Sequence, residues 1–162
     1  MEFDEVLKNR FSVREFKDQP VENEKLEKIT ETARMAPSGV NFQPYKIGVF
    51  KKCDEFKDLF MQENFHDAPA AIGIAINYDE GFEMPDGNNL ADIDVGILAS
   101  YIALEATNQG LGSCIIASFN KDIAREMMGL DEKYNPILFI PMGYKNCEKP
   151  PMVRKDLKDL VI

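Results

Sequence analysis

The stretch from Ala91 to Gln109 constrains the fold most, because it predicts one long helix that is apolar on more than one face. Apolar side chains recur at helical spacing and form one stripe, at Ile93, Ile97, Tyr101 and Leu104. Small side chains keep other faces apolar, at Ala99, Ala103 and Ala106. Such a helix belongs in the middle of a domain or in an interface between subunits.

The remaining segments predict a mixture of helices and strands in irregular order. Helical spacing or composition predicts four further helices, at residues 2–9, 23–35, 54–62 and 123–128. Alternating or continuous apolar runs predict strands at residues 45–50, 70–77, 113–116 and 136–142. The polar stretch 78–89 is expected to be a loop, and the tail from Lys145 to be extended. The expected fold class is therefore α+β, with a central sheet flanked by helices.

Composition narrows the class of protein. A chain of 162 residues with 44% apolar residues suits a single domain spanning residues 1–162. Its formal net charge of -9 argues against nucleic acid and anionic membranes as partners. No apolar run approaches the ~20 residues of a membrane-spanning helix, and the acidic start is unlike a signal peptide. Three widely spaced cysteines form no zinc or disulfide pattern, which favours free thiols in the cytoplasm.

Several familiar catalytic devices are missing. Neither the G-x-G-x-x-G turn of a dinucleotide-binding fold nor a phosphate-binding P-loop occurs. His66 is the only histidine and no serine lies in a G-x-S-x-G turn, which argues against a hydrolytic triad. The acidic residues lack the spacing of a metal-binding loop. These absences argue against the common dinucleotide-binding, P-loop and hydrolytic classes.

Three segments carry concentrated polar groups, although each alone also has a purely structural interpretation. The first is Arg10-Phe11-Ser12-Val13-Arg14, where two guanidiniums and a hydroxyl could grip a phosphate or could form a solvated basic turn. The second is the stiff, proline-bracketed loop from Ala36 to Pro44, which holds Ser38, Asn41 and Gln43. The third is Gly143-Tyr144 followed by Arg154-Lys155, a second cationic pair or a frayed tail.

Taken in order, these segments resemble the motifs of the nitroreductase family. Its R-x-S-x-R motif is matched by Arg10, Ser12 and Arg14, and its A-P-S-x-x-N-x-Q-P-W motif by residues 36–45, with Tyr45 in the Trp position. A middle D-x-G motif is matched from Asp94, and its G-L-G end by residues 110–112. The closing G-Y-P and R-K pattern appears at Gly143-Tyr144 and 154–155, with Lys145 where Pro is common. The resemblance spans nearly the whole chain.

This resemblance implies a mostly antiparallel sheet in an intertwined homodimer that binds FMN at the subunit interface. By position, Arg10, Ser12 and Arg14 would contact the phosphate and the pyrimidine side of the flavin. Arg154 and Lys155 would complete the phosphate site. The other subunit would supply four residues facing the ring system: Pro37, Ser38, Gly39 and Asn41. The backbone of Ile116, Ala117 and Ser118 would approach the reactive edge of the flavin, and Ser118 replaces a common Gly there.

The implied activity is that of an FMN-dependent oxidoreductase. NAD(P)H would deliver electrons in a ping-pong cycle to an electron-poor acceptor such as a nitroaromatic or a quinone. The flavin carries the reaction, so no protein nucleophile or histidine base is required, in accord with their absence. Two alternatives stay open: a flavin carrier without nicotinamide-dependent turnover, and a cofactor-free interaction domain. The preference between NADH and NADPH and the physiological acceptor are not determined by these motifs.

Overall fold

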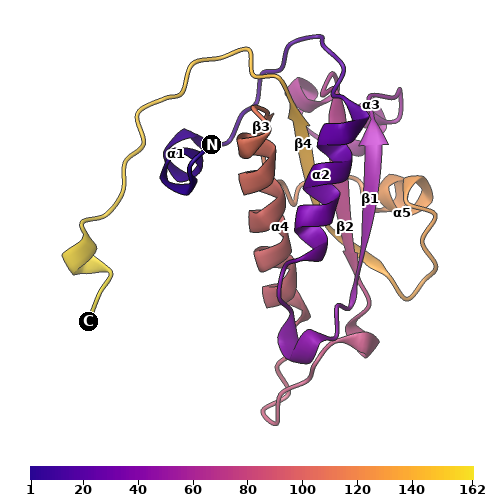
Figure 1. Ribbon diagram of the computed structural model, residues 1–162. Coiled ribbons are helices and arrows are strands. Elements are labelled where there is room, and N and C mark those ends of the chain that lie inside the picture. The colour runs from indigo at the N-terminus through magenta and orange to yellow at the C-terminus, as the bar shows by residue number, and fades with distance from the viewer.

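A four-stranded antiparallel sheet forms the centre of the computed structural model, which describes residues 1–162 (Figure 1). The strands lie in the order β1-β2-β4-β3. Their bounds are β1 Tyr45–Lys51, β2 Ala70–Ile76, β3 Gly112–Ser113 and β4 Asn135–Gly143. Every neighbouring pair is antiparallel, so the expected central antiparallel sheet is confirmed.

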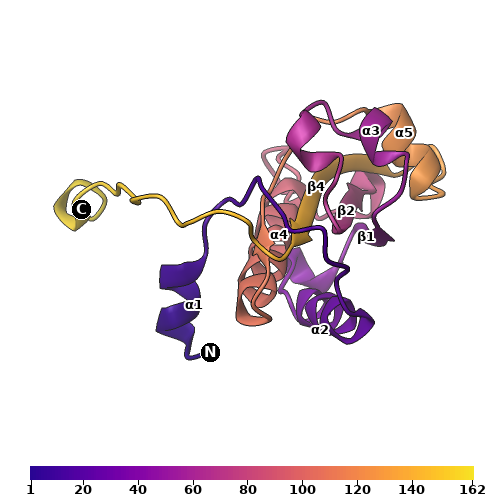
Figure 2. The same cartoon turned by 90° about the horizontal axis from the view of Figure 1, so that it is seen from above.

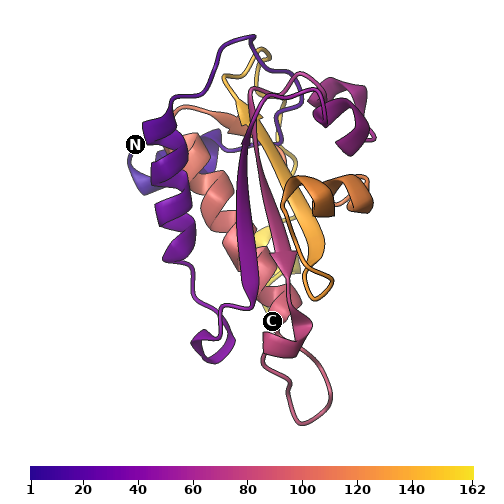
Figure 3. The same ribbon diagram turned by 90° about the vertical axis from the view of Figure 1, so that its right-hand side faces the viewer.

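Helices cover both faces of this sheet. The helices are α1 Phe3–Asn9, α2 Asn23–Arg34, α3 Phe56–Leu59, α4 Ala91–Asn108 and α5 Lys121–Met127. Figure 3 shows α2 and α4 on one face and α3 and α5 on the other. Short 3-10 turns lie at Gly39–Asn41, Glu63–Phe65, Tyr78–Glu80 and Leu157–Asp159. The α+β class expected from the sequence is therefore correct, and no helix has the length and apolar character needed to cross a membrane.

Strand β2 lies at the centre and is buried along its whole length. Its larger side chains, Ile72, Ile74 and Ile76, pack on the face covered by α2 and α4. The opposite face carries small residues, and a Cβ at Gly73 would lie 2.7 Å from the ring of Phe139. The small residues therefore leave room for that ring, which belongs to a second core cluster under α3 and α5.

Helix α4 faces the sheet with a different stripe from the one the sequence suggested. The buried apolar positions include Ala91, Val95, Leu98, Ile102 and Ala106. Ile93 is 59% exposed, and the other three residues of the predicted stripe, Ile97, Tyr101 and Leu104, are only partly buried. Periodicity failed to identify the inner face because the helix is apolar nearly all round. A large apolar stripe therefore stays at the surface of a single chain.

Two expected elements are shorter than predicted. The helix expected at residues 54–62 is limited to α3, because Phe60 turns into extended backbone, pairs with Phe119 and buries its ring. The strand expected at residues 113–116 is regular only at β3. The Cys114 N–H still donates to the Pro141 carbonyl and Ile116 still pairs with Phe139. Pro141 has no N–H to return the bond, so the regular ladder stops there.

Helix α5 begins two residues earlier than expected, at Lys121. The Asn120 side chain accepts hydrogen bonds from the N–H groups of Asp122 and Ile123, which caps the helix start. Gly129 follows the helix with a φ of 60°, the left-handed conformation that a glycine after a helix adopts readily. The expected C-terminal signal at Gly129 is therefore correct.

Gly112 in β3 permits a close approach that any side chain would block. A Cβ at this position would lie 2.5 Å from Cγ2 of Val13, which is only 1% exposed. We expect Gly112→Ala to lower the free energy of unfolding by about 1–3 kcal/mol, the usual cost of overpacking. Gly96→Ala is the matched control, because no atom lies within 4 Å of its Cβ and the position is inside α4. Gly96→Ala should raise the free energy of unfolding by about 0.5–1 kcal/mol. Urea titrations that gave the same change for both variants would contradict the close contact of Gly112 with Val13.

Candidate functional site

The Arg10–Arg14 segment runs as extended backbone along the β3 edge of the sheet. The Val13 N–H donates to the Ser113 carbonyl at 3.0 Å, and Ser12 forms a parallel bridge with Ser113. Phe11 and Val13 are buried at 6% and 1% exposure. Because side chains alternate along extended backbone, the intervening polar side chains point away from the core. These side chains belong to Arg10, Ser12 and Arg14, which the sequence singled out.

Both arginines of this segment are free to bind an anion. Neither Arg10 nor Arg14 forms an ion pair, although five other cationic side chains do. The only hydrogen bond from the Arg14 guanidinium reaches the Ser12 carbonyl at 3.5 Å. Arg14 is exposed and Arg10 is partly buried, and in a chain with a net charge of -9 two unpaired guanidiniums on one edge create a local positive site.

The Ile116–Ser118 segment follows β3 along the same edge of the sheet and lies beside the middle of β4. Ile116 exchanges two backbone hydrogen bonds of 2.9 Å with Phe139, which fixes the start of the segment. Ala117 and Ser118 are exposed, and their N–H groups make no hydrogen bond. The Ser118 hydroxyl lies 3.3 Å from the sulfur of Met61. Unpaired N–H groups next to a fixed strand are suitable donors for the polar edge of a ligand.

A short segment from Met61 to Asn64 connects these two groups of residues. Met61 touches Ser118, and the Asn64 side-chain amide donates to the Arg14 carbonyl at 3.3 Å. A hollow of about 260 Å³ lies beside Arg14 and Asn64. The fold therefore brings the first predicted motif next to residues 116–118, although they are about a hundred positions apart in sequence.

The Pro37–Asn41 segment lies at the other end of the sheet (Figure 1). It precedes β1, whose first residue Tyr45 pairs with Ile76 at the far end of β2. Strand β3 instead pairs with Met142 of β4, and Met142 pairs with Ala70 at the opposite end of β2. Seven residues of strand separate the two ends, roughly 20 Å at the usual rise. One chain alone does not bring these predicted residues together.

The C-terminal tail leaves the body of the molecule, as Figure 2 shows. Arg154 and Lys155 are both exposed in this tail. The Arg154 guanidinium donates only to the Val153 carbonyl and to the sulfur of Met152. Nearer the body, the Lys149 side chain donates to the Lys8 carbonyl. The second cationic pair is therefore present but stands away from Arg10 and Arg14 within one chain.

Asp94 contacts the Pro37–Asn41 segment; the sequence identified it as the first residue of the D-x-G motif but assigned it no role. It lies on α4, is only 2% exposed, and accepts a hydrogen bond of 2.8 Å from the Gly39 N–H. Its second carboxylate oxygen is buried without a partner. The indication in the sequence was a charged residue beside the apolar positions Ala91 and Val95, which pack against the sheet.

Two tyrosines at this end of the molecule have raised pKa values. Burial raises the pKa of Tyr78 to about 12, helped by its hydrogen bond to Asp92. Burial also raises the pKa of Tyr45, and the negative charge of Asp94 adds to the effect. Both hydroxyls therefore stay protonated at neutral pH; that of Tyr78 donates to Asp92, whereas that of Tyr45 is buried without a hydrogen-bond partner.

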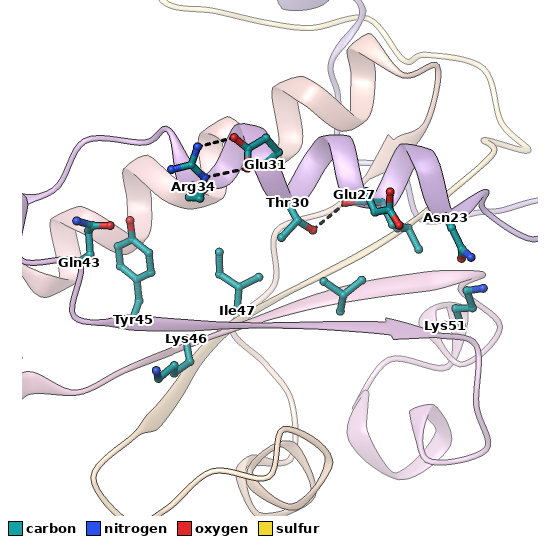
Figure 4. A pocket seen from close by; sticks show the side chains of 12 residues that line it. Asn23, Glu27, Thr30, Glu31, Arg34, Gln43, Tyr45, Lys46, Ile47 and Lys51 are labelled. Carbon is teal, nitrogen blue, oxygen red and sulfur yellow. Dashed lines mark hydrogen bonds and ion pairs between the residues drawn. The ribbon is translucent and has the colours of Figure 1, made fainter.

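The largest groove lies elsewhere, between α2 and the edge strand β1 (Figure 4). It has a volume of about 650 Å³. Two of its charged side chains pair with each other, since Arg34 binds both carboxylate oxygens of Glu31, and the Thr30 hydroxyl donates to the Leu26 carbonyl. The groove follows β1, which is the opposite edge of the sheet from β3, so it lies away from the unpaired arginines of the first motif.

Comparisons with known proteins identify similar sequences and structures. A model of the nitroreductase family matches residues 7–64 and 54–144. A protein of Streptococcus pyogenes named as an NAD(P)H nitroreductase is 29% identical, with 99% of this chain and 98% of the relative covered. A crystal structure of a nitroreductase family protein from Clostridium difficile 630 has a TM-score of 0.86 at 36% identity and covers 100% of this chain and 98% of its own. An FMN-dependent nitroreductase from Clostridium difficile R20291 has a TM-score of 0.79 at 30% identity, covering 97% and 95%.

The family model thus covers most of the chain, including the exposed arginine motif, the loop before β1, the long helix and the strand that ends at Gly143. The fold, the motifs and the relatives lead to the same assignment, and the chain belongs to the nitroreductase family.

Proposed function

We propose that this protein is an FMN-dependent oxidoreductase that takes electrons from NAD(P)H. The observation that carries the proposal is the pair of unpaired guanidiniums, Arg10 and Arg14, beside the free N–H groups of residues 117–118. Relatives named as an NAD(P)H nitroreductase and as an FMN-dependent nitroreductase support the choice of electron donor and cofactor. The whole chain, residues 1–162, would form one FMN-binding domain.

The donor set at the β3 edge suits FMN chemically. The phosphate of FMN is a dianion, which requires several cationic or N–H donors. Arg10 and Arg14 provide unpaired cations, Ser12 adds an exposed hydroxyl, and Arg154 with Lys155 would add further charge. Ser113 beside them has a buried hydroxyl without a partner, which is a further unused polar group at this edge. The residues present therefore fit the cofactor.

We further infer that two chains form an intertwined homodimer with the cofactor between them. The partly exposed stripe on α4 is too apolar for a surface helix, and Ile93 in it is 59% exposed. The tail also carries uncovered apolar side chains, with Val153 at 87% and Leu157 at 75% exposure. A second chain would bring its own Pro37–Asn41 segment to the β3 edge, which a single chain does not do.

Within such a site, each segment of the chain has a defined task. FMN, when bound, supplies the acceptance and the transfer of hydride. Arg10 and Arg14 would hold its phosphate and orient it, and the N–H groups of Ala117 and Ser118 would donate to its polar edge. Ser38 and Asn41 from the partner would cover the ring from the other side. Nicotinamide and acceptor would occupy the same face in turn, in a ping-pong order, and electron-poor compounds such as nitroaromatics or quinones would be the acceptors.

Anaerobic mixing with NADH or NADPH tests this proposal most directly. The expected result is that the purified protein is yellow and that the flavin absorbance bleaches with at least one nicotinamide, then recovers when a quinone or nitroaromatic is added. A yellow protein that bleaches with neither donor would support the alternative of a flavin carrier. A colourless protein that cannot be reconstituted with FMN would exclude both interpretations.

The three free cysteines fit a reducing compartment, so we place the protein in the cytoplasm.

Removal of residues 150–162 tests the role of the tail. These residues are exposed and include Leu157, Leu160 and Val161 at 75%, 63% and 64% exposure. We expect the shortened chain to elute as a monomer in light-scattering chromatography and to lose FMN on gel filtration, whereas the full chain at the same concentration stays dimeric. A shortened chain that remains a flavin-bound dimer would refute the proposed role of the tail in the dimer and in FMN binding.

A further inference from the structure

We propose that Asp94 is a positioning residue for the cofactor site, because its buried carboxylate holds the Ser38–Gln43 loop in the conformation that faces the partner's flavin. The inference rests on the proposed function. It concerns a residue that touches the loop and not the cofactor itself.

The Ser38–Gln43 loop adopts a backbone conformation that its residues do not favour. Val40, Asn41 and Gln43 have φ angles of 51°, 62° and 52°. The left-handed region is uncommon for residues other than glycine, and for a β-branched residue such as Val40 it is a marked outlier. Three such residues within four positions persist only when the surroundings hold them in place.

Contacts inside the loop do not anchor it to the rest of the fold. The Gln43 N–H donates to the Ser38 hydroxyl at 3.1 Å, and the Gln43 side-chain amide donates to the Asn41 carbonyl at 3.1 Å. The Asn41 N–H donates to the Ser38 carbonyl. These bonds fold the loop on itself, but none of them joins it to a helix.

The bond from the Gly39 N–H to Asp94 is the one that ties the loop to α4. Its length of 2.8 Å is short for an N–H donor, as expected for a carboxylate acceptor. Gly39 also sits closely against the helix start, because a Cβ there would lie 3.1 Å from Cδ1 of Leu90. A charged acceptor and a residue without a side chain therefore meet at the point where the loop touches α4.

Nothing in the packing of a single chain requires a carboxylate at this place. Asp94 is 2% exposed and uses only one of its two oxygens. A buried, incompletely paired carboxylate is normally less favourable than an apolar side chain of similar size. Its charge also reaches the residue after the loop, since it raises the pKa of Tyr45. A role in holding the loop accounts for an acid that stability alone does not require.

Asp94→Leu removes the acceptor while keeping a side chain that branches at the same atom, and Asp94→Asn keeps an oxygen acceptor without the charge. Asp92→Ala is the control, because Asp92 lies in the same helical turn but binds Tyr78 outside the loop. Amide hydrogen exchange of residues 38–43 is measured in the FMN-free protein, FMN affinity by quenching of flavin fluorescence, and global stability by urea titration.

For Asp94→Leu we expect faster exchange at Gly39 and an FMN Kd raised about tenfold, the scale of one charge-assisted hydrogen bond. Its global stability should equal or exceed that of the unchanged protein. Asp94→Asn and Asp92→Ala should stay within about threefold of the original Kd. If Asp94→Leu does not fold, Asp94→Ala takes its place.

Unchanged exchange and unchanged FMN affinity in Asp94→Leu would overturn the inference. The inference would also be overturned if Asp94→Asn raised the FMN Kd as much as Asp94→Leu does. The loss of the hydrogen bond to Gly39 could not then explain the weaker binding. An unmodified protein that binds no FMN would instead overturn the proposed function, and the exchange of residues 38–43 would still decide whether Asp94 holds the loop.

Discussion

Replacing Arg10 or Arg14 by Ala is expected to weaken FMN binding by about 1.5–3 kcal/mol for each substitution, or roughly tenfold to a hundredfold in Kd. Both guanidiniums are unpaired within the chain and point outward from the β3 edge. Their removal therefore breaks no ion pair of the folded protein, and the loss should appear in FMN binding rather than in stability. Fluorescence titration of the flavin-free protein with FMN measures the effect.

Arg34→Ala provides the matched control for charge. Arg34 is also exposed, but it lies on α2 and binds Glu31 at 2.6 Å. Its removal changes the net charge by the same unit without touching the β3 edge, so FMN affinity should stay close to that of the original chain. Equal losses in all three variants would indicate a general effect of charge, and full retention of flavin in both Arg10→Ala and Arg14→Ala would refute the phosphate assignment.

Phe139→Ala is expected to lower the free energy of unfolding by about 3–5 kcal/mol, the usual range for a buried aromatic side chain. Phe139 is fully buried, and its ring lies 5.0 Å from that of Phe119 and 6.0 Å from that of Phe60. It also fills the space above Gly73 and pairs through its backbone with Ile116. A loss of this size is a large share of the stability of an ordinary domain.

Urea titration of the FMN-free protein measures this loss, because bound ligand would otherwise shift the result. Phe42→Ala is the control, since Phe42 is 52% exposed and makes one aromatic contact, with Phe82 at 6.0 Å. Its effect should be well below that of Phe139→Ala. Similar losses in the two variants would show that the second core does not depend on the Phe139 ring.

Local patterns predicted the elements of the fold well, because each depends on nearby residues. Alternation and apolar runs located β1, β2 and β4, and helical spacing located α1, α2 and α4. The errors arose where a distant partner decides the outcome. Phe60 leaves its helix to pair with Phe119, and the ladder beside β3 stops at Pro141 of β4. Neither partner is visible from the local sequence.

The candidate site was predictable in part for a similar reason. Motif order identified Arg10, Ser12 and Arg14, and the structure places these residues on one exposed edge. The pairing of Ser12 with Ser113 and the contact of Asn64 with Arg14 join segments far apart in sequence, so no local pattern announces them. Asp94 was identified only as a member of the D-x-G motif and was given no role, because its partner is the backbone of Gly39, and a backbone N–H leaves no mark in the sequence.

The separation of the Pro37–Asn41 segment from the β3 edge has a consequence for inheritance. The proposed dimer has two cofactor sites. Each site combines the β3 edge of one chain with the Pro37–Asn41 segment of the other, so neither chain forms a complete site alone. A chain defective at Arg10 and another defective at Asn41 would each be inactive alone, yet a mixed pair would rebuild one intact site from its two undamaged halves. Two defective alleles of such a protein would therefore complement each other within mixed dimers. A substitution at one end of the sheet would be selected by how well it fits the other end of the partner chain.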